Sequence, residues 1–385
     1  MSKCSKNLWD DFAAKYEKSN IPTVVVDAEV KVVWSNTAGE AFFESEAMSH
    51  DDKRVFFAML STVYDKIVDN LPMILAYSLC GCDCKLTVLP FFSKTSFSAC
   101  AIMLAGIEHK PKIAEDEASQ ADASQRMIDT FAHQTRAPLS TIFSALAGIS
   151  RCNDEFGDPD VQEYINKISL QAFRLLRSSA AITEQHRYES GEKNFLPQEQ
   201  DIALFLQQLC RVVSVRMQGM GVKFYFSLPG AAVPVSFDGE KIATVLLNIF
   251  SNAAKFAGDS PEIKVSLSMT EKYAVVSVTD NGMGIKEDEL ASVFDDYYSR
   301  DPKTESICGD GLGLALCRRI ILEHDGFVFV ASREGEGTRA VFYLPLSTER
   351  NSAELTVRDV ANEYMSNRFS KMYVILSDVC PPPFL

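Results

Sequence analysis

Two glycine-containing segments in the second half of the chain constrain its fold more than any other feature. The first runs from Asp280 to Gly284 (DNGMG) and follows a β-branched stretch, residues 275–278, that predicts a strand. The second runs from Gly309 to Leu314 (GDGLGL) and leads into a predicted helix that begins near Leu312. Glycines at these points allow close approach of the backbone to a ligand, so the pair predicts a binding pocket in an α/β domain.

Neither segment has the form of the commonest nucleotide-binding loops. The spacing is not that of a Walker-type P-loop, and no βαβ unit follows the second segment, as a Rossmann fingerprint would require. Two further blocks precede the glycine segments, namely residues 248–256 (NIFSNAAKF) and 131–139 (FAHQTRAPL). Two Asn four residues apart are by themselves an ordinary helix face, and a lone helical His is usually a surface residue. The blocks are therefore informative only together and in this order.

The four blocks in this order resemble those of the sensor histidine kinases of two-component signalling. The resemblance spans roughly residues 118–348 and includes an ATP-binding domain of the GHKL type, shared in outline with gyrase, heat-shock chaperone and mismatch-repair ATPases. It implies a homodimeric protein-histidine kinase that uses ATP and Mg²⁺ to phosphorylate His133. The phosphoryl group would then pass to an aspartate in the receiver domain of a response regulator.

The chain divides into four predicted regions, which together make an α+β multidomain protein. A PAS-like mixed α/β sensor is expected over residues 1–112, and a helical hairpin for dimerisation and histidine phosphotransfer over residues 113–190. A GHKL (Bergerat) α/β sandwich that binds ATP is expected over residues 195–348. Residues 349–385 form an extension without an assigned role, in which residues 372–376 predict a strand.

The PAS-like region rests on a strand-turn-strand-helix pattern. Residues 21–27 and 30–34 predict a strand pair, Asn36 opens a short helix, and residues 84–91 and 98–107 predict two more strands. This order is similar to the PAS fold and implies an input from a small molecule or a protein. A bound haem or flavin has no identifiable ligand residue, so an empty or protein-binding module is the simpler interpretation.

Three alternating cysteines, Cys80, Cys82 and Cys84, lie at the start of the strand predicted over residues 84–91. A metal or redox role remains open. Structural zinc sites need a fourth ligand and usually longer gaps, and no matching Cys or His pair lies nearby. A hairpin bend built from small residues therefore fits this cluster better.

Two heptad seams predict an antiparallel helical hairpin, because apolar or small residues recur at steps of three and four in both helices. They are Ile128, Phe131, Thr135, Pro138, Ile142, Ala145 and Ile149 in the first helix, and Val161, Ile165, Ile168, Ala172, Leu175, Ser179 and Ile182 in the second. Between them, Asp158-Pro159 predicts an N-cap and a first helical residue. Such a hairpin keeps one side apolar, so we expect two copies to form a four-helix bundle.

The resemblance assigns roles to the adenine and metal ends of the nucleotide site. Asp280 would accept a hydrogen bond from the adenine amino group, and Gly282 and Gly284 would let the backbone approach the base and sugar. Asn252 would offer its amide oxygen to Mg²⁺, a cation that prefers oxygen ligands, and Asn248 lies one turn earlier on the same face.

The phosphates would lie against Lys255 and the second glycine segment. Lys255 can reach a phosphate as a point charge. The positions that lead into the following helix are Gly309, Gly311, Leu312 and Gly313. A helix N-terminus offers unpaired N–H groups and a positive dipole end to phosphates. Residues 294–308 would form the mobile lid, anchored by aromatic residues that include Phe294 and Tyr298.

The His133 block departs from the family pattern in two places. We assign His133, Gln134 and Arg136 as catalytic residues. An acid usually follows the His, and Gln134 can orient an imidazole but cannot take a proton. Loss of a general base typically lowers a rate ~10²–10⁴-fold. Ala137 replaces the Thr or Asn that commonly positions water for dephosphorylation. We therefore expect a slow kinase with weak phosphatase activity.

Composition and charge exclude several other classes of protein. The net charge of -14 over 385 residues argues against a nucleic-acid-binding surface, and no apolar run is long enough to span a bilayer. The N-terminus lacks a signal-peptide pattern, so we expect a cytoplasmic protein. The principal alternative is a degenerate kinase that binds ATP as a regulatory scaffold. A GHKL ATPase outside signalling is disfavoured because Asn248 stands where hydrolytic members carry a catalytic Glu.

Overall fold

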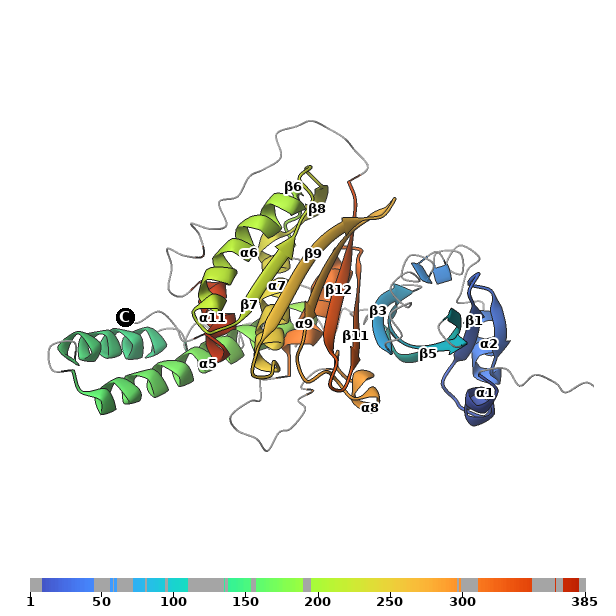
Figure 1. Cartoon of the computed structure of the whole chain (residues 1–385), viewed down its shortest axis with the longest axis horizontal. Coiled ribbons are helices and arrows are strands. Elements are labelled where there is room, and N and C mark those ends of the chain that lie inside the picture. Colours follow the sequence, from blue (N-terminus) through green and yellow to red (C-terminus); the bar gives the residue numbers. More distant parts are fainter. Residues whose placement is uncertain are drawn as a thin grey trace, which may run out of the picture.

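The computed structural model places a helical hairpin, an α/β unit and an N-terminal group of strands side by side along the molecule (Figure 1). The described residues are 9–44, 56–57, 59–60, 72–79, 82–93, 96–109, 135, 138–153, 157–189, 195–295, 298, 311–347, 364 and 370–380. None of the helices within these ranges is long and apolar enough to cross a membrane.

Five antiparallel strands form the N-terminal group, in the order β2-β1-β5-β4-β3. Its elements are α1 (Asp10–Tyr16), β1 (Thr23–Asp27), β2 (Val32–Ser35), α2 (Thr37–Glu44), β3 (Met73–Leu79), β4 (Cys82–Ser93) and β5 (Ser96–His109). The four strands and the helix predicted from the sequence are confirmed, whereas β3 was not predicted. The residues between β3 and β4 include Cys80, which lies outside the described residues, and Cys84 is buried in the core of this group.

Asn36 explains why the helix begins where the sequence predicted. Its side chain is fully buried, and its Oδ1 accepts hydrogen bonds from the backbone N–H groups of Thr23 (3.0 Å) and Gly39 (2.7 Å). Its Nδ2 donates to three backbone carbonyls, of which Ile21 at 2.9 Å is the nearest. One side-chain amide therefore accepts a hydrogen bond from a backbone N–H group in the first turn of α2 and joins this helix to β1.

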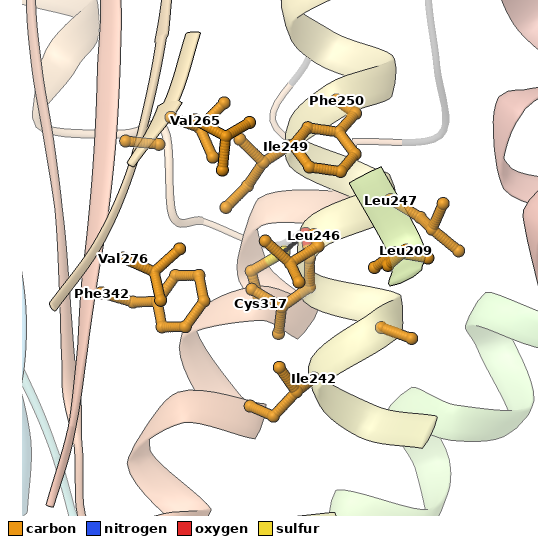
Figure 2. Packing of buried hydrophobic residues seen from close by; sticks show 14 of the residues in the cluster. Leu209, Ile242, Leu246, Leu247, Ile249, Phe250, Val265, Val276, Cys317 and Phe342 are labelled. Atoms are coloured by element: carbon orange, nitrogen blue, oxygen red, sulfur yellow. Dashed lines mark hydrogen bonds between the residues drawn. The ribbon is translucent and has the colours of Figure 1, made fainter. Parts of the chain in front are cut away.

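The α/β unit is a sheet covered on one face by three helices. The strands of this sheet are β7 (Lys223–Ser227), β9 (Glu262–Met269), β10 (Tyr273–Asp280), β11 (Phe327–Arg333) and β12 (Gly337–Pro345). A separate two-stranded sheet is formed by β6 (Gln198–Asp201) and β8 (Pro234–Phe237). The helices of the unit are α6 (Ile202–Gln218), α7 (Gly239–Lys255), α8 (Glu287–Leu290) and α9 (Gly313–Glu323), of which α6, α7 and α9 cover the sheet (Figure 1). Figure 2 shows Leu246 of α7 and Cys317 of α9 facing Val276 and Phe342 of the sheet. The strand predicted over residues 275–278 and the helix predicted to begin near Leu312 are confirmed as β10 and α9.

The N-terminal strands and the α/β unit share one ten-stranded sheet, which the sequence did not predict. Strand β3 pairs antiparallel with β11, with Leu75 opposite Phe329. Ile74 enters the core under the helices, whereas Leu75 enters the core on the other face of the sheet. An ion pair from Lys85 of β4 to Asp295 joins the two parts again, directly before residue 296.

The hairpin consists of a helix over residues 138–153 and α5 (Pro159–Glu189). As predicted, Asp158 caps α5, since its Oδ1 accepts a hydrogen bond from the Asp160 N–H at 2.9 Å. The faces that pack together contain Leu139, Phe143, Leu146, Ile165, Ala172 and Phe173.

The predicted first-helix seam faces away from α5, in agreement with the expectation that the hairpin keeps one apolar side. Its residues Ile142 and Ile149 are 38% and 47% exposed, and Ile168, Leu175 and Ile182 of α5 are 48%, 62% and 37% exposed. The helix instead turns its neighbouring apolar face, which carries Phe143, toward α5. One side of the hairpin is consequently an apolar stripe that nothing in the described chain covers.

The predicted strand over residues 372–376 is wrong. Residues Lys371–Ile375 form a short helix, α11, continued by a 3-10 turn over Leu376–Asp378. The β-branched residues favoured a strand, but tertiary packing decides here. Met372 and Ile375, three residues apart, lie on one helical face buried against the α/β unit, while Val374 packs into the hairpin core.

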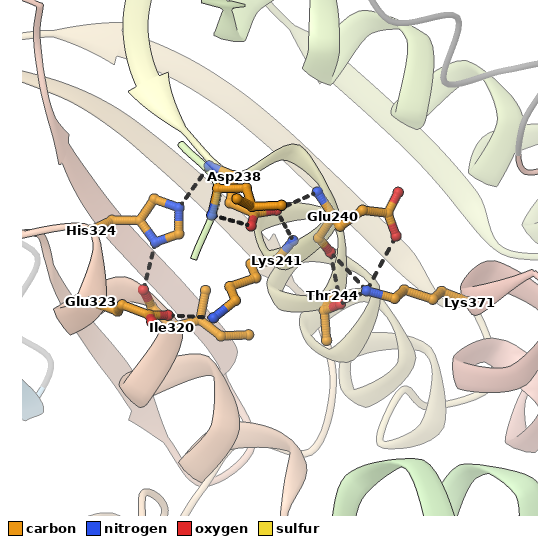
Figure 3. A network of polar contacts seen from close by, with 9 residues as sticks. Asp238, Glu240, Lys241, Thr244, Ile320, Glu323, His324 and Lys371 are labelled. Atoms are coloured by element: carbon orange, nitrogen blue, oxygen red, sulfur yellow. Dashed lines mark hydrogen bonds and ion pairs between the residues drawn. The ribbon is translucent and has the colours of Figure 1, made fainter. Parts of the chain in front are cut away.

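A buried polar network fixes the start of α7 (Figure 3). Asp238 caps the helix by accepting hydrogen bonds from the N–H groups of Glu240 (3.1 Å) and Lys241 (3.2 Å). His324 accepts from the Asp238 N–H at its Nε2 (3.0 Å), and its Nδ1 lies 2.7 Å from the Ile320 carbonyl oxygen. These partners require a neutral imidazole with the proton on Nδ1, and burial lowers its pKa.

Acidification is expected to destabilise the protein through His324. The folded state holds this group neutral with its pKa below 6.5, so protons bind preferentially to the unfolded chain. The stabilising contribution is present above pH 6.5 and is lost as the pH falls through the lowered value. A His324→Gln variant should lose about 1 kcal/mol at pH 7 but show a smaller decline between pH 7.5 and 5.5 in denaturant titrations. Equal pH slopes for both proteins would contradict this assignment.

Candidate functional site

A cavity of about 510 Å³ lies where α7, α9 and the end of β10 meet the hairpin and the C-terminal segment. Eight of the predicted site residues line it: Asn248, Asn252, Lys255, Asp280, Gly284, Gly311, Leu312 and Gly313. Gly282 is buried beside it. Residues far apart in the sequence are therefore brought together in one place, as the motif order predicted.

Asp280 is the last residue of β10 and lines this cavity. Its Oδ1 accepts hydrogen bonds from the backbone N–H groups of Gly282 (2.8 Å) and Thr338 (3.1 Å). Oδ2 accepts none from the described residues, which leaves it for a ligand donor. Burial raises the pKa of this carboxyl to about 6, although the two backbone hydrogen bonds oppose the shift. Near neutral pH the group is an ionised acceptor.

The glycines of the first segment are required by the protein's own backbone, a reason for glycine that the sequence did not predict. Gly284 has φ +66°, and a Cβ at this position would lie 1.9 Å from the carbonyl oxygen of Arg333. A Cβ on Gly282 would lie 2.6 Å from the carbonyl oxygen of Phe256. The loop is thus pressed against the β11–β12 turn and the end of α7, and this contact fixes Asp280.

The polar face of α7 forms one wall. Asn248 is buried, its Nδ2 donates to the Thr244 carbonyl oxygen at 2.9 Å, and its Oδ1 faces the start of α9. Asn252 follows one turn later and is partly buried. Both amide oxygens are ligand types that Mg²⁺ accepts. Lys255 lies one turn further along, with its Nζ 5.5 Å from the Phe256 ring centre.

The opposite wall is the N-terminus of α9, an eleven-residue helix that begins at Gly313. The preceding residue, Leu312, makes no side-chain cap hydrogen bond. The N–H groups in the first turn of α9 therefore have no capping side chain from this residue and can donate to a ligand in the cavity. A Cβ on Gly313 would lie 3.0 Å from Asn248 Oδ1. The helix end and the Asn face of α7 are therefore close enough to contact one anionic group together.

The comparisons with known proteins agree with this geometry. Residues 237–348 match the family described as histidine kinase-, DNA gyrase B-, and HSP90-like ATPase. The adaptive-response sensory kinase SasA of Prochlorococcus marinus is 28% identical over 62% of this chain and 61% of its own length. The sensor histidine kinase WalK of Bacillus subtilis is 27% identical over 61% of this chain and 39% of its own length. The chain is thus similar to sensor histidine kinases, and residues 237–348 match the ATPase family that includes them.

A further SasA, from Synechococcus sp., is 31% identical over 59% of this chain and 60% of its own length. The chain thus spans less than two thirds of the length of each of these kinases. The similarity to the first of these relatives extends over 240 residues, more than the length of the ATPase family match at residues 237–348.

Part of the predicted kinase site lies outside the described residues. His133, Gln134, Arg136 and Gly309 are in this group, as are Ala137 and most of the predicted lid. Of the predicted lid anchors, Phe294 is buried and Tyr298 lines the cavity. Thr135, two residues after His133, has its Oγ1 2.9 Å from Ser179 Oγ of α5, so this end of the hairpin is tied to α5.

Sequence reasoning missed several residues that shape the kinase site. Thr338 donates its N–H to Asp280, and Ser332 Oγ accepts from the Ile285 N–H (2.9 Å) while donating to the Gly337 carbonyl oxygen (2.7 Å). Gly337 was the available signal, because a glycine pair in a short link between strands often marks a strained turn. Lys371, from the C-terminal segment, also lines the cavity and had no sequence signal.

Proposed function

We propose that this chain is an Mg-ATP-dependent sensor histidine kinase that phosphorylates itself on His133 and passes the phosphoryl group to a response regulator. The observation that carries the proposal is the joint placement of Asp280, Asn248 and the α9 N-terminus around one cavity that also touches the hairpin. The residues Leu139 and Ser140, which line it from the hairpin, follow His133 by six and seven positions in the sequence.

Each group has a defined task in this reaction. The unpartnered Oδ2 of Asp280 selects adenine through its amino group. The α9 N-terminus and Lys255 stabilise phosphate charge, which is the main requirement of phosphoryl transfer. A nitrogen of neutral His133 attacks the γ-phosphorus, forming an N–P bond while the bond to the ADP oxygen breaks. ADP leaves, and the imidazole proton passes to solvent or a neighbouring group.

The amide oxygens on the polar face of α7 suit a magnesium ion. Asn252 would hold it through its amide oxygen, with Asn248 beside it, and the remaining ligands would be water and phosphate oxygens. When bound, Mg²⁺ neutralises charge on the phosphates. The amide of Asn252 has no side-chain hydrogen bond to other described residues, consistent with a group kept for a ligand.

The regional assignments are part of the proposal. The strand order β2-β1-β5-β4-β3 with a covering helix supports a PAS-like input module over residues 1–112, for a small molecule or a protein. The exposed apolar stripe of the hairpin, which includes Ile149 and Leu175, supports a homodimeric four-helix bundle formed by residues 113–190. Residues 195–348 bind ATP. A cytoplasmic setting belongs to the proposal because ATP is available there.

Gln134 and Ala137 are the residues that we expect to slow this kinase and to weaken its phosphatase activity. The alternative function, a degenerate kinase that uses ATP binding as a regulatory signal, retains the same nucleotide site. It differs only in whether His133 becomes phosphorylated.

Incubation of the full-length chain with γ-³²P-ATP and Mg²⁺ tests the proposal, with His133→Ala as the matched control. We expect acid-labile, alkali-stable label on the wild type, none on the variant, and the mass of a dimer for both by light scattering. Label of equal intensity on both proteins would contradict the assignment of His133. No label, with ATP binding retained, would favour the scaffold and make Gln134→Glu the first reversion to measure.

A further inference from the structure

The C-terminal segment, residues 370–380, is built into the boundary between the ATP-binding unit and the hairpin. Met372 and Leu376 pack in the core of the ATP-binding unit, and Val374 packs in the hairpin core. Asp378 pairs with two arginines of α5, Arg174 Nε at 3.2 Å and Arg177 Nη1 at 2.6 Å. Contacts with the ATP-binding unit and with the hairpin therefore fix the position of this segment.

Lys371 begins the helix of this segment and reaches α7 (Figure 3). Its Nζ lies 3.2 Å from Glu240 Oε2, 3.4 Å from Thr244 Oγ1 and 3.5 Å from the Glu240 carbonyl oxygen. Lys371 and Thr244 both line the cavity described above. The lysine side chain is 46% exposed, so its ion pair with Glu240 is of the solvated kind that contributes little stability and exchanges partners readily.

The orientation of helix α7 indicates how a nucleotide would lie along the cavity. Its C-terminal end lies at the adenine end, because the Phe256 carbonyl oxygen accepts a hydrogen bond from Met283 in the loop that follows Asp280. Thr244 lies twelve residues earlier, or about 18 Å along the helix. Asn248, between them, faces the N-terminus of α9. A nucleotide that starts at Asp280 and follows α7 therefore brings its last phosphate toward Asn248 and Thr244.

We propose that Lys371 binds the terminal phosphate of ATP, so that the C-terminal segment completes the nucleotide site from outside the ATPase family region. The inference rests on the proposed function, since it takes ATP as the ligand. When the nucleotide binds, Lys371 leaves the Glu240 carboxylate and pairs with a phosphate about one helical turn further along α7. Its ammonium group is therefore paired with an anion both with and without the nucleotide. The segment thus makes the site sensitive to the number of phosphates on the nucleotide.

Affinities of the full-length protein for ADP and for the non-hydrolysable analogue AMPPNP, measured by calorimetry with Mg²⁺, test this assignment. Lys371→Met should weaken AMPPNP binding about fivefold, because one charge-assisted contact is lost, and leave ADP binding unchanged. Lys371→Arg should retain most of the AMPPNP affinity. Lys272→Met, which removes the same charge from the exposed β9–β10 turn, should change neither affinity.

A second variant separates ligand binding from a merely structural role of the segment. Glu240→Gln removes the resting ion-pair partner of Lys371 and should tighten AMPPNP binding. Equal effects of Lys371→Met on AMPPNP and ADP, or no effect on either, would overturn the inference. If the wild-type protein bound neither nucleotide, the proposed function itself would fail, and the two failures are therefore distinguishable.

Discussion

Replacing Asp280 with Asn is expected to weaken ATP binding on the order of 100-fold without destabilising the fold. The two backbone N–H groups of Gly282 and Thr338 both bond to Oδ1, so they would select the amide oxygen of an Asn side chain for that position. The amide NH₂ would then occupy the position of Oδ2 and face the adenine amino group. Two donors would point at each other in a partly buried site.

The stability of the unliganded Asp280→Asn variant is the control. The folded-state pKa of Asp280 is raised to about 6 from 3.8, so its ionised form is disfavoured in the folded protein. Its contribution to stability is full below pH 3.8 and is lost as the pH rises through about 6. At pH 8 the neutral variant should therefore unfold at an equal or higher denaturant concentration. Unchanged ATP affinity in calorimetry would show that Asp280 does not contact the base.

Replacing Gly284 with Ala is expected to destabilise the protein by about 3 kcal/mol or more. Two costs combine at this position. The backbone has φ +66°, and the new Cβ would lie 1.9 Å from the Arg333 carbonyl oxygen, so the loop and the β11–β12 turn must separate. Because the same loop carries Asp280, nucleotide affinity should fall together with stability.

Gly335 provides a matched control for the Gly284 variant. It also has a positive φ, +84°, but a Cβ there would meet nothing within 4 Å. Gly335→Ala should therefore cost only the conformational term, about 1–2 kcal/mol. Urea denaturation of both variants isolates the steric contribution of Gly284. Similar losses in the two variants would mean that the close contact with Arg333 relaxes without cost.

The shared sheet would give the proposed input module a direct route to the proposed nucleotide site. β3 pairs with β11, and β11 leads into the turn at Arg333 against which the Gly284 loop is pressed. The Lys85–Asp295 ion pair contacts the second residue of the predicted lid. A change in β3 or β4 would therefore reach Asp280 through a few contacts and without passing along the hairpin.

Much of the candidate site was predictable because its signals are local. The Asp280–Gly284 loop, the Asn248–Asn252 helix face and the start of α9 each depend on residues within a few positions of one another. The cap at Asp158-Pro159 and the helix opened by Asn36 are local in the same sense. Hydrogen bonds and backbone preferences over short spans leave a pattern that the sequence alone displays.

The sequence by itself determined the order of the elements, the resemblance to kinases and most residues of the nucleotide cavity. Only the tertiary structure decided that β3 extends the sheet, that the first-helix seam faces outward, and that residues 371–375 form a helix. It also decided that Gly284 meets Arg333 and that Lys371 reaches Thr244. These features join residues far apart in the chain, and burial of apolar surface between such partners overrides local preference without leaving a local pattern.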